Sequence, residues 1–330
     1  MLRKKDRFMN KKAQHIDKLQ SFKINNSQQW VLVRGTDIKN PLVLFLHGGP
    51  GFSQIAFAPA FQKKLEEHFL VVNWDQRGAG KSFSEQEQNR ILTLEDFIND
   101  MHLFINALLL EYKKDKIILI GHSWGSTLGT LYCVKYPEHI SGLVCCGYGI
   151  NFRDGEKVSL QYLSLKASEA KCTNFFKEME PFKNEISKSN FTQYIAFKSK
   201  WMGKFGGYFN VPYSRLLIKA LPSLLSFRYY SIKDYSNWIK GIKRGQAIGK
   251  NTLLNIDLFT QAPKVNVPLF FCIGRHDYNT PWEVARKYYK KIEAPYKEWI
   301  WFENSAHSPI FEESDMFAEI MVSDISPHLA

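Results

Sequence analysis

The sequence predicts an α/β protein, with a mostly parallel sheet, helices on both of its faces and a helical cap inserted into the chain. Short runs of consecutive apolar residues, such as 42–46 and 117–120, are typical of strands buried on both faces. Amphipathic helical segments alternate with these runs, as they do in parallel βαβ units. From residue 151 the buried-strand runs stop, and the sequence becomes rich in aromatic residues and helix formers. We therefore predict a core in two parts, 1–150 and 259–330, with a cap over 151–258.

Local signals support the individual elements. Asn25–Ser27 are turn residues between two segments of strand character, which predicts a hairpin. Thr93 begins a Thr-x-x-Asp capping signal ahead of a helical apolar periodicity. Residues 1–14 are expected to form a loose tail. In chain order, the expected elements of the core are strands at 15–24, 29–35 and 42–46, a helix at 58–68, a strand at 69–74, a helix at 93–112, a strand at 117–120, a helix at 126–136, strands at 140–146 and 268–273, a helix at 281–291, a strand at 297–302 and a helix at 314–325.

The composition excludes several classes of protein. Of 330 residues, 45% are hydrophobic and 23% are charged, as in soluble globular proteins. No apolar run approaches the roughly 18 residues of a membrane-spanning helix. The basic segment 1–12 has no apolar stretch after it, unlike a secretory signal, so we expect a cytoplasmic protein with no membrane partner. The five cysteines are scattered without metal-ligand spacing, so we expect no metal and no cofactor.

The net charge of +12 is spread unevenly along the chain. Residues 151–262 hold 18 Lys and Arg against 8 Asp and Glu, a net of +10, and the rest of the chain holds 26 against 24, a net of +2. A basic segment can bind nucleic acid or an anionic membrane. Here the lysines are interspersed and no nucleic-acid motif accompanies them, so we expect a solvated surface and no nucleic-acid partner.

Residues 116–128 carry the strongest functional signal. An apolar run leads into GHSWG (121–125), which fits G-x-S-x-G, and a helix-compatible segment follows. In such a strand–turn–helix context the serine, Ser123, is held in a strained conformation with its hydroxyl lifted out of the sheet. Glycines two residues on either side let the strand and the helix approach. The motif alone also fits a glycine-rich turn whose serine does no chemistry, so other motifs have to support it.

Two loops at strand ends supply surroundings that this serine would need. Strand 42–46 runs into HGGPG (47–51), whose backbone N–H groups are free to face a ligand and to supply an oxyanion-hole donor. The next strand ends in DQRGAGKS (75–82), a charged and glycine-rich loop. We expect this second loop to brace the site, with Asp75 and Arg77 forming a structural ion pair.

Ser, Asp and His follow one another in chain order, each after a predicted strand, as expected for a catalytic triad on such a sheet. Asp277 follows strand 268–273, and His307 follows strand 297–302. Ser123 would be the nucleophile and His307 its base, because an imidazole is largely neutral at pH 7. Asp277 would orient the imidazole and stabilise its charged form.

The oxyanion would be bound by two backbone N–H groups, those of Gly49 and of Trp124, the residue after the nucleophile. His122 and His276 compete for the role of base. Each directly neighbours a member of the triad in the chain, and because side chains adjacent along a strand end point to different sides, it is expected to point away from the triad. His47 begins the oxyanion loop and is expected to shape it.

Together the motifs HGGPG, DQRGAGKS, GHSWGSTLGT, GRHD and SAHSP resemble those of the proline iminopeptidase-like branch of the α/β-hydrolases. The similarity is strong over residues 40–150 and 265–310 and faint across the cap. The resemblance implies an α/β-hydrolase fold and an aminopeptidase that releases proline or another N-terminal residue from short peptides. It also implies that carboxylates of the cap hold the free ammonium group of the substrate.

The cap departs from this family. The family's tryptophan-containing segment that leads into Trp-Glu-Gly has no clear equivalent, and the nearest stretch, which contains Trp201, carries no glutamate. Between residues 186 and 258 the only acidic residues are Asp234 and Asp257. The remaining candidates for substrate binding are Trp201 and four glutamates that also fit solvated helix faces: Glu169, Glu178, Glu180 and Glu185.

Three functions remain open. The first is a cofactor-free serine hydrolase that cleaves short peptides or small amides through an acyl-enzyme. The second is a carboxylesterase or lipase-like enzyme with the same machinery and an apolar, aromatic cap. The third is a non-catalytic relative that binds a ligand or partner, although the presence of Ser123, Asp277 and His307 argues against it. The oligomeric state cannot be predicted from the sequence.

Overall fold

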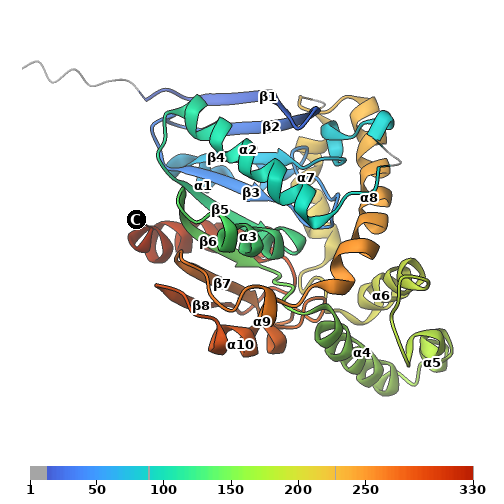
Figure 1. Cartoon of the computed structure of the whole chain (residues 1–330). Helices are drawn as coiled ribbons and strands as arrows, with labels where there is room; N and C mark the ends of the chain where they lie inside the picture. Colours follow the sequence, from blue (N-terminus) through green and yellow to red (C-terminus); the bar gives the residue numbers. More distant parts are fainter. Residues whose placement is uncertain (1–12, 88–89, 227, 330) are drawn as a thin grey trace, which may run out of the picture.

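An eight-stranded sheet lies at the centre of the protein, with helices on both of its faces (Figure 1). The computed structural model describes residues 13–87, 90–226 and 228–329, so the expected tail at 1–14 falls almost wholly outside the described part. The strands are β1 (Ile16–Ile24), β2 (Ser27–Gly35), β3 (Leu42–Leu46), β4 (Leu70–Asp75), β5 (Ile117–His122), β6 (Ile140–Cys146), β7 (Leu269–Gly274) and β8 (Lys297–Phe302).

The strand order is β1-β2-β4-β3-β5-β6-β7-β8. The pairs β1–β2 and β2–β4 are antiparallel, and every later pair is parallel. This arrangement confirms the predicted α/β class with a mostly parallel sheet. The opening hairpin turns on Asn25 and Asn26 alone, which both have positive φ (46° and 62°). Because asparagine tolerates this conformation, β2 begins at Ser27, two residues earlier than predicted.

Helices cover each face of the sheet around a separate apolar cluster. Phe104 of α2, Leu128 of α3 and Tyr288 of α10 pack on one face, and Leu65 of α1 and Phe317 of α12 pack on the other. Parallel strands buried on both sides explain the continuous apolar runs in the sequence. The helices of the core are α1 (Lys63–His68), α2 (Leu94–Tyr112), α3 (Trp124–Lys135), α9 (Leu258–Gln261), α10 (Trp282–Lys291), α11 (Pro309–Glu312) and α12 (Ser314–Ile320).

Two predicted helices are less regular than the sequence indicated. The helix expected over 58–68 is a 3₁₀ turn at Ala58–Ala60 followed by α1, because the chain leaves helical geometry at Phe61 and Gln62. There the Gln62 side chain hydrogen-bonds buried Asn73. The last predicted helix ends as α12 at Ile320 and continues as a π-helical turn over Met321–Ile325.

A second group of helices lies beyond one end of the strands (Figure 1). The chain leaves the core and returns to it at one place, since Asn151 and Asp257 form an isolated antiparallel bridge. The first three helices share an aromatic cluster of their own around Phe175 and Trp201, whereas the last two pack against the core. These helices are α4 (Phe152–Glu169), α5 (Thr173–Met179), α6 (Phe191–Phe205), α7 (Tyr213–Leu225) and α8 (Ile232–Thr252).

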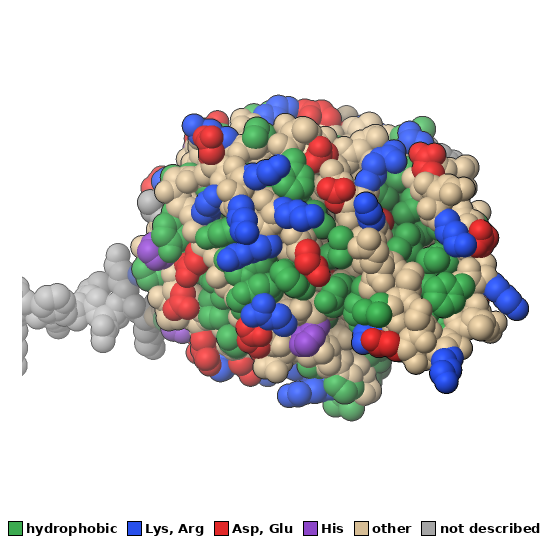
Figure 2. Space-filling view, turned by 90° about the horizontal axis from the view of Figure 1, so that it is seen from below, with side chains coloured by type: hydrophobic (Ala, Val, Ile, Leu, Met, Phe, Trp, Pro, Cys, Tyr) green, Lys and Arg blue, Asp and Glu red, His purple; other side chains and the backbone are tan. Residues whose placement is uncertain are grey.

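The lysines and arginines on the surface are interspersed with other side chains. Figure 2 shows one face on which basic side chains alternate with acidic and hydrophobic ones. Among the described helices, none is long and apolar enough to cross a membrane.

Candidate active site

The G-x-S-x-G segment forms a sharp turn between β5 and α3. Ser123 has φ 55° and ψ −119°, a conformation that L-residues rarely adopt. A Cβ on Gly121 would lie 2.5 Å from the backbone of Ser126, and one on Gly125 would lie 1.9 Å from the carbonyl oxygen of Leu46. The two glycines therefore let strand and helix close on the serine. Ser123 is half-buried and lines a large cavity.

Asp277 and His307 meet at the carboxyl ends of β7 and β8. The Asp277 Oδ2 atom lies 3.1 Å from His307 Nδ1, and both side chains are buried. The other carboxylate oxygen accepts backbone N–H groups of Asn279 and Thr280, each at 2.9 Å. The Thr280 hydroxyl donates to Oδ2 at 2.9 Å. These bonds fix the carboxylate so that it accepts the Nδ1 proton, which leaves Nε2 as the basic nitrogen of His307.

The Nε2 atom of His307 faces the side-chain amide of Asn279, with Nδ2 at 3.1 Å. Within the described residues, no hydrogen bond joins His307 to the Ser123 hydroxyl. Ser123 follows His122 in the chain, and the ring centroid of His122 lies 5.1 Å from that of His307. To act as a base towards Ser123, His307 has to exchange the Asn279 amide for the serine hydroxyl.

The other histidines near the site have different surroundings. The side chain of His122 is held between the Ser308 hydroxyl (3.0 Å) and the carbonyl oxygen of His307 (3.2 Å), and burial lowers its pKa to about 3. Burial also lowers the pKa of His47, to about 4. Both imidazoles are therefore neutral at pH 7. His276 is exposed.

The backbone N–H groups of Gly49 and Trp124 have no acceptor among the residues that the structure describes. One side chain connects their surroundings. Gln76 donates to the carbonyl oxygen of His47 at 3.1 Å and accepts the indole N–H of Trp124 at 3.2 Å. The backbone N–H of Gln76 also donates to His47 Nε2 at 3.1 Å. Gln76 thus ties the loop before Gly49 to the residue after Ser123, a role that its place in DQRG did not reveal.

Glu312 is a second positioning residue that the sequence did not indicate. Its Oε1 atom accepts the backbone N–H groups of Ala306 (3.0 Å) and Ser308 (3.1 Å), which flank His307. Its Oε2 atom accepts the backbone N–H of Asn210 at 2.6 Å, from the segment before α7. Burial raises the pKa of Glu312. No motif contains this residue, so only the tertiary structure identifies it.

The expected Asp75–Arg77 ion pair is not formed. Buried Asp75 accepts the hydroxyls of Ser53 and Tyr230 and the backbone N–H of Lys81 at 2.8 Å, and burial raises its pKa to about 7. The guanidinium of Arg77 instead pairs with Asp100 at 2.6 Å and with Glu87 at 2.7 Å. The prediction was wrong because side chains from distant segments, Ser53 and Tyr230 for Asp75 and Asp100 for Arg77, take the place of the expected pair. The loop still braces the site, through these bonds and through Gln76.

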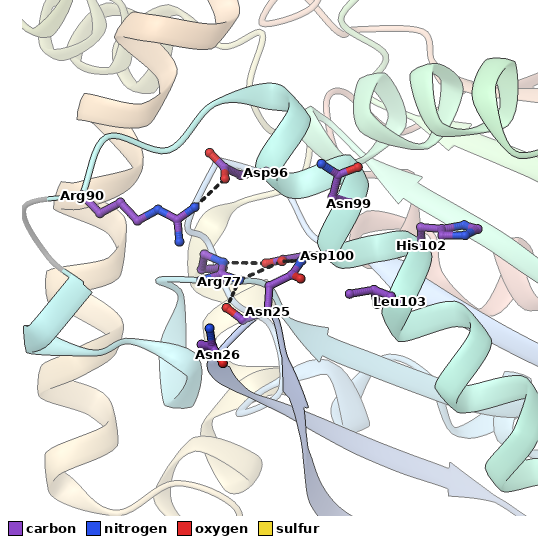
Figure 3. Close-up of a pocket in the computed structure, with 9 residues that line it drawn as sticks. All are labelled: Asn25, Asn26, Arg77, Arg90, Asp96, Asn99, Asp100, His102 and Leu103. Carbon is purple, nitrogen blue, oxygen red and sulfur yellow. Dashed lines mark hydrogen bonds and ion pairs between the residues drawn. The ribbon is translucent and has the colours of Figure 1, made fainter.

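Arg77 and Asp100 also line a separate pocket of about 560 Å³ (Figure 3). Arg90 and Asp96 pair across its rim at 2.6 Å, and the Asn25 amide donates to Asp100 at 2.8 Å. The charges of this pocket are therefore neutralised by one another. None of its lining residues belongs to the Ser–Asp–His group.

The cavity beside Ser123 has a volume of about 1100 Å³ and lies between the core and the cap. Aromatic and aliphatic side chains dominate its lining. Its lining includes two side chains that are charged at neutral pH, Glu156 of α4 and Lys198 of α6. Both are buried, and the Lys198 ammonium lies 2.7 Å from Glu156 Oε2 and 2.7 Å from the carbonyl oxygen of Asn279. The hydroxyl of Tyr194 also donates to Glu156.

The substrate-binding candidates of the cap do not line this cavity. Trp201 is 2% exposed inside the cap's own aromatic cluster, and its indole N–H donates to Glu178 at 3.0 Å. The four glutamates pair instead with cations of the cap surface: Glu169 with Lys166, Glu178 with Lys200, Glu180 with Lys183 and Glu185 with Arg153. The structure therefore brings Glu156, and not these four, to the cavity.

Helix α8 of the cap touches the oxyanion loop directly. A Cβ on Gly245 would lie 1.7 Å from the carbonyl oxygen of Pro50, so Gly245→Ala should push the helix and the loop apart. If the N–H of Gly49 binds the oxyanion as the sequence predicts, this substitution should lower kcat/KM for a p-nitrophenyl ester by about tenfold or more, because the displaced N–H no longer meets the oxyanion.

Gly249→Ala, on the same helix, is the matched control. The nearest atom to a Cβ there is a side-chain carbon of Leu253 at 3.2 Å, which can shift. The control should keep its activity and lose no thermal stability, because alanine favours the helix. Full activity in Gly245→Ala would show that this contact does not position the loop.

Comparison with known proteins adds independent information. The family model of the alpha/beta hydrolase fold matches residues 41–314. The chain is 33% identical over 316 residues to the "Probable aminopeptidase YbaC" of Bacillus subtilis (strain 168), which covers 94% of this chain and 97% of that one. It is 26% identical over 288 residues to a proline iminopeptidase of Heyndrickxia coagulans, covering 84% and 88% of the two chains. A solved structure of the proline iminopeptidase of Mycobacterium smegmatis matches with a TM-score of 0.67 and 16% identity over 94% of this chain and 98% of that chain, a likeness of fold alone.

Proposed function

This chain belongs to the α/β-hydrolase family, and from that premise we propose that it is a serine hydrolase in which Ser123, His307 and Asp277 act as a triad. The observations that support the proposal are the strained Ser123 turn on the cavity wall and the buried Asp277–His307 pair, whose chain neighbours Asn279 and Ser308 line the same cavity. A serine in this conformation exposes its hydroxyl, and a base oriented by a carboxylate activates it.

The geometry supports an acyl-enzyme route. His307 Nε2 takes the proton of the Ser123 hydroxyl as the oxygen bonds to the substrate carbonyl carbon, and the charge on the imidazolium is stabilised by Asp277. The carbonyl oxygen becomes an oxyanion that accepts the free N–H groups of Gly49 and Trp124. The imidazolium then protonates the leaving group as its bond breaks. Water attacks the acyl-enzyme by the same steps in reverse and releases Ser123.

For the substrate we propose a short peptide with a free N-terminus. The aminopeptidase and proline iminopeptidase names of the two relatives support this choice. An ammonium group taken out of water needs a carboxylate. Glu156 is the carboxylate that lines the cavity, and it would have to share its oxygens between Lys198 and the substrate.

A second candidate is hydrolysis of small apolar esters. It is favoured by the lining of the cavity, where aromatic and aliphatic side chains dominate and Glu156 and Lys198 neutralise each other. Such a lining attracts apolar acyl groups without requiring a charge on the substrate.

The aminopeptidase and esterase candidates predict different effects of N-acetylating the substrate. Prolyl, alanyl and leucyl arylamides should be hydrolysed with a higher kcat/KM than their N-acetylated forms, by on the order of tenfold or more, if an ammonium is recognised. Glu156→Gln should raise KM for the free-amine substrates by a similar factor and should leave p-nitrophenyl esters nearly unaffected. Michaelis–Menten kinetics on this panel provide the measurement.

Glu178→Gln is the matched control, since Glu178 lies in the cap but not on the cavity wall. It should behave like the unmodified protein on every substrate. If acetylated and free-amine substrates are cleaved equally well, the aminopeptidase proposal fails and the esterase proposal stands.

A further inference from the structure

Helix α7 is apolar on two adjoining sides. Its inner side places Leu216, Ala220 and Leu224 on the wall of the large cavity. Its outer side leaves five large apolar side chains exposed, at a spacing that forms a stripe along the helix. Their exposed fractions are Tyr213 58%, Leu217 42%, Ile218 71%, Leu221 48% and Leu225 60%. No other described helix exposes as many large apolar side chains. A solvated helix would carry polar residues at these positions.

The exposed stripe continues into the cavity. Tyr213 and Leu217 belong to both surfaces, since they line the cavity and are also exposed to solvent. Phe52, which directly follows the HGGPG loop, also lines the cavity, and its side chain is 39% exposed. The apolar face of α7 and the wall of the cavity therefore form one connected apolar surface, with the cavity mouth at its edge.

Basic residues surround this surface. Residues 213–243 contain six Lys and Arg against one acidic residue, Asp234, which pairs with Lys81 at 2.7 Å. Two of the six pair with carboxylates from elsewhere in the chain, Arg228 with Asp17 at 3.0 Å and Lys240 with Glu85 at 2.7 Å. Arg215 on α7 and Lys233 on α8 are exposed, and neither forms an ion pair within 4.0 Å of a described carboxylate. An apolar helix face bordered by free cations is complementary to acyl chains beneath anionic headgroups.

We propose that α7 docks on the surface of an anionic lipid bilayer, with its apolar stripe among the acyl chains and its cations at the headgroups. A second copy of this chain fits less well, because it would bring two positively charged segments together. The helix lies in the interface and does not cross it. The sequence did not indicate this surface, because the exposed stripe can be recognised only once the structure shows which side of α7 faces the cavity. Docking does not depend on any chemistry at Ser123.

The test is flotation of the full chain with vesicles of two compositions, phosphatidylcholine alone and equal parts of phosphatidylcholine and phosphatidylglycerol. We expect binding to the anionic vesicles, weakened by salt, and little binding to the neutral ones. The double substitution Ile218→Ser/Leu221→Ser should lower the partition coefficient by about tenfold or more, because two apolar side chains no longer enter the bilayer.

The matched control is Leu103→Ser/Leu110→Ser on α2, which removes two exposed leucines (44% and 82%) from a different surface. It should bind as the unmodified protein does. Three results would overturn the proposal: no binding to anionic vesicles, equal loss of binding in the control, or size-exclusion chromatography in which the unmodified chain is a dimer and the α7 variant a monomer. The last result would assign the stripe to a second copy of the chain.

Discussion

Ser123→Ala should abolish both covalent labelling by a fluorophosphonate probe and hydrolysis of every ester or amide substrate. The probe phosphonylates an activated serine hydroxyl, and Ser123 has the strained turn conformation of the proposed nucleophile, with His307 as its proposed base. Loss of a serine nucleophile lowers kcat by about 10⁴-fold or more in enzymes of this kind, because the remaining groups have no acyl acceptor to activate. Labelling is read by intact-protein mass spectrometry, which should show one added group on the unmodified chain.

A second serine of the cavity wall provides the control. Ser199 of α6 lines the same cavity, but it forms no hydrogen bond with a histidine of the described chain and lies in a regular helix, not in a strained turn. Ser199→Ala should be labelled at the normal rate. Labelling that persists in Ser123→Ala, or that disappears in Ser199→Ala, would refute the assignment of the nucleophile.

The fold could be predicted from the sequence because the patterns that specify its strands, helices and turns are local. The buried strands are continuous apolar runs, and the Thr93–Asp96 capping box appears in the structure as the motif predicts. The Ser123 turn is equally local, since two glycines and one serine within five residues determine it. Differences arose at element ends, where single residues such as Asn25 and Asn26 decide the backbone geometry, and within the helix predicted over 58–68, which is interrupted between Ala60 and Lys63.

The residues that line the cavity could not be predicted from the sequence in the same way. Glu156 is one of several acidic residues on cap helices, and nothing in its neighbourhood of the sequence distinguishes it from Glu169. It becomes buried because Tyr194 and Lys198, about forty residues later, fold over it. Asn279 follows the GRHD motif by two residues, yet its contact with His307 spans 28 residues. Such side chains acquire their roles from pairs of distant segments, which one sequence does not reveal.

His307→Ala should lower kcat by about 10³-fold or more, whereas His276→Ala should change it little. His307 is buried, contacts Asp277 at 3.1 Å and lies 3.1 Å from the amide of Asn279, which lines the cavity, whereas His276 is exposed. Without the imidazole, no group in the site can take the Ser123 proton during attack. Steady-state hydrolysis of a p-nitrophenyl ester, with circular dichroism to verify folding, measures both variants. The opposite ranking would mean that His276 is the base.

The pH profile gives a separate test of the same assignment. An imidazole protonated at Nε2 has no lone pair to accept the Ser123 proton, so activity should fall on acidification if His307 is the base. Burial lowers the pKa of His47 to about 4 and that of His122 to about 3, so the folded protein keeps both neutral down to about pH 5. Any loss of activity between about pH 7 and pH 5 can therefore not come from these two groups. If the same acid loss of kcat/KM persists in the residual activity of His307→Ala, the loss does not come from His307 and the assignment of the base fails.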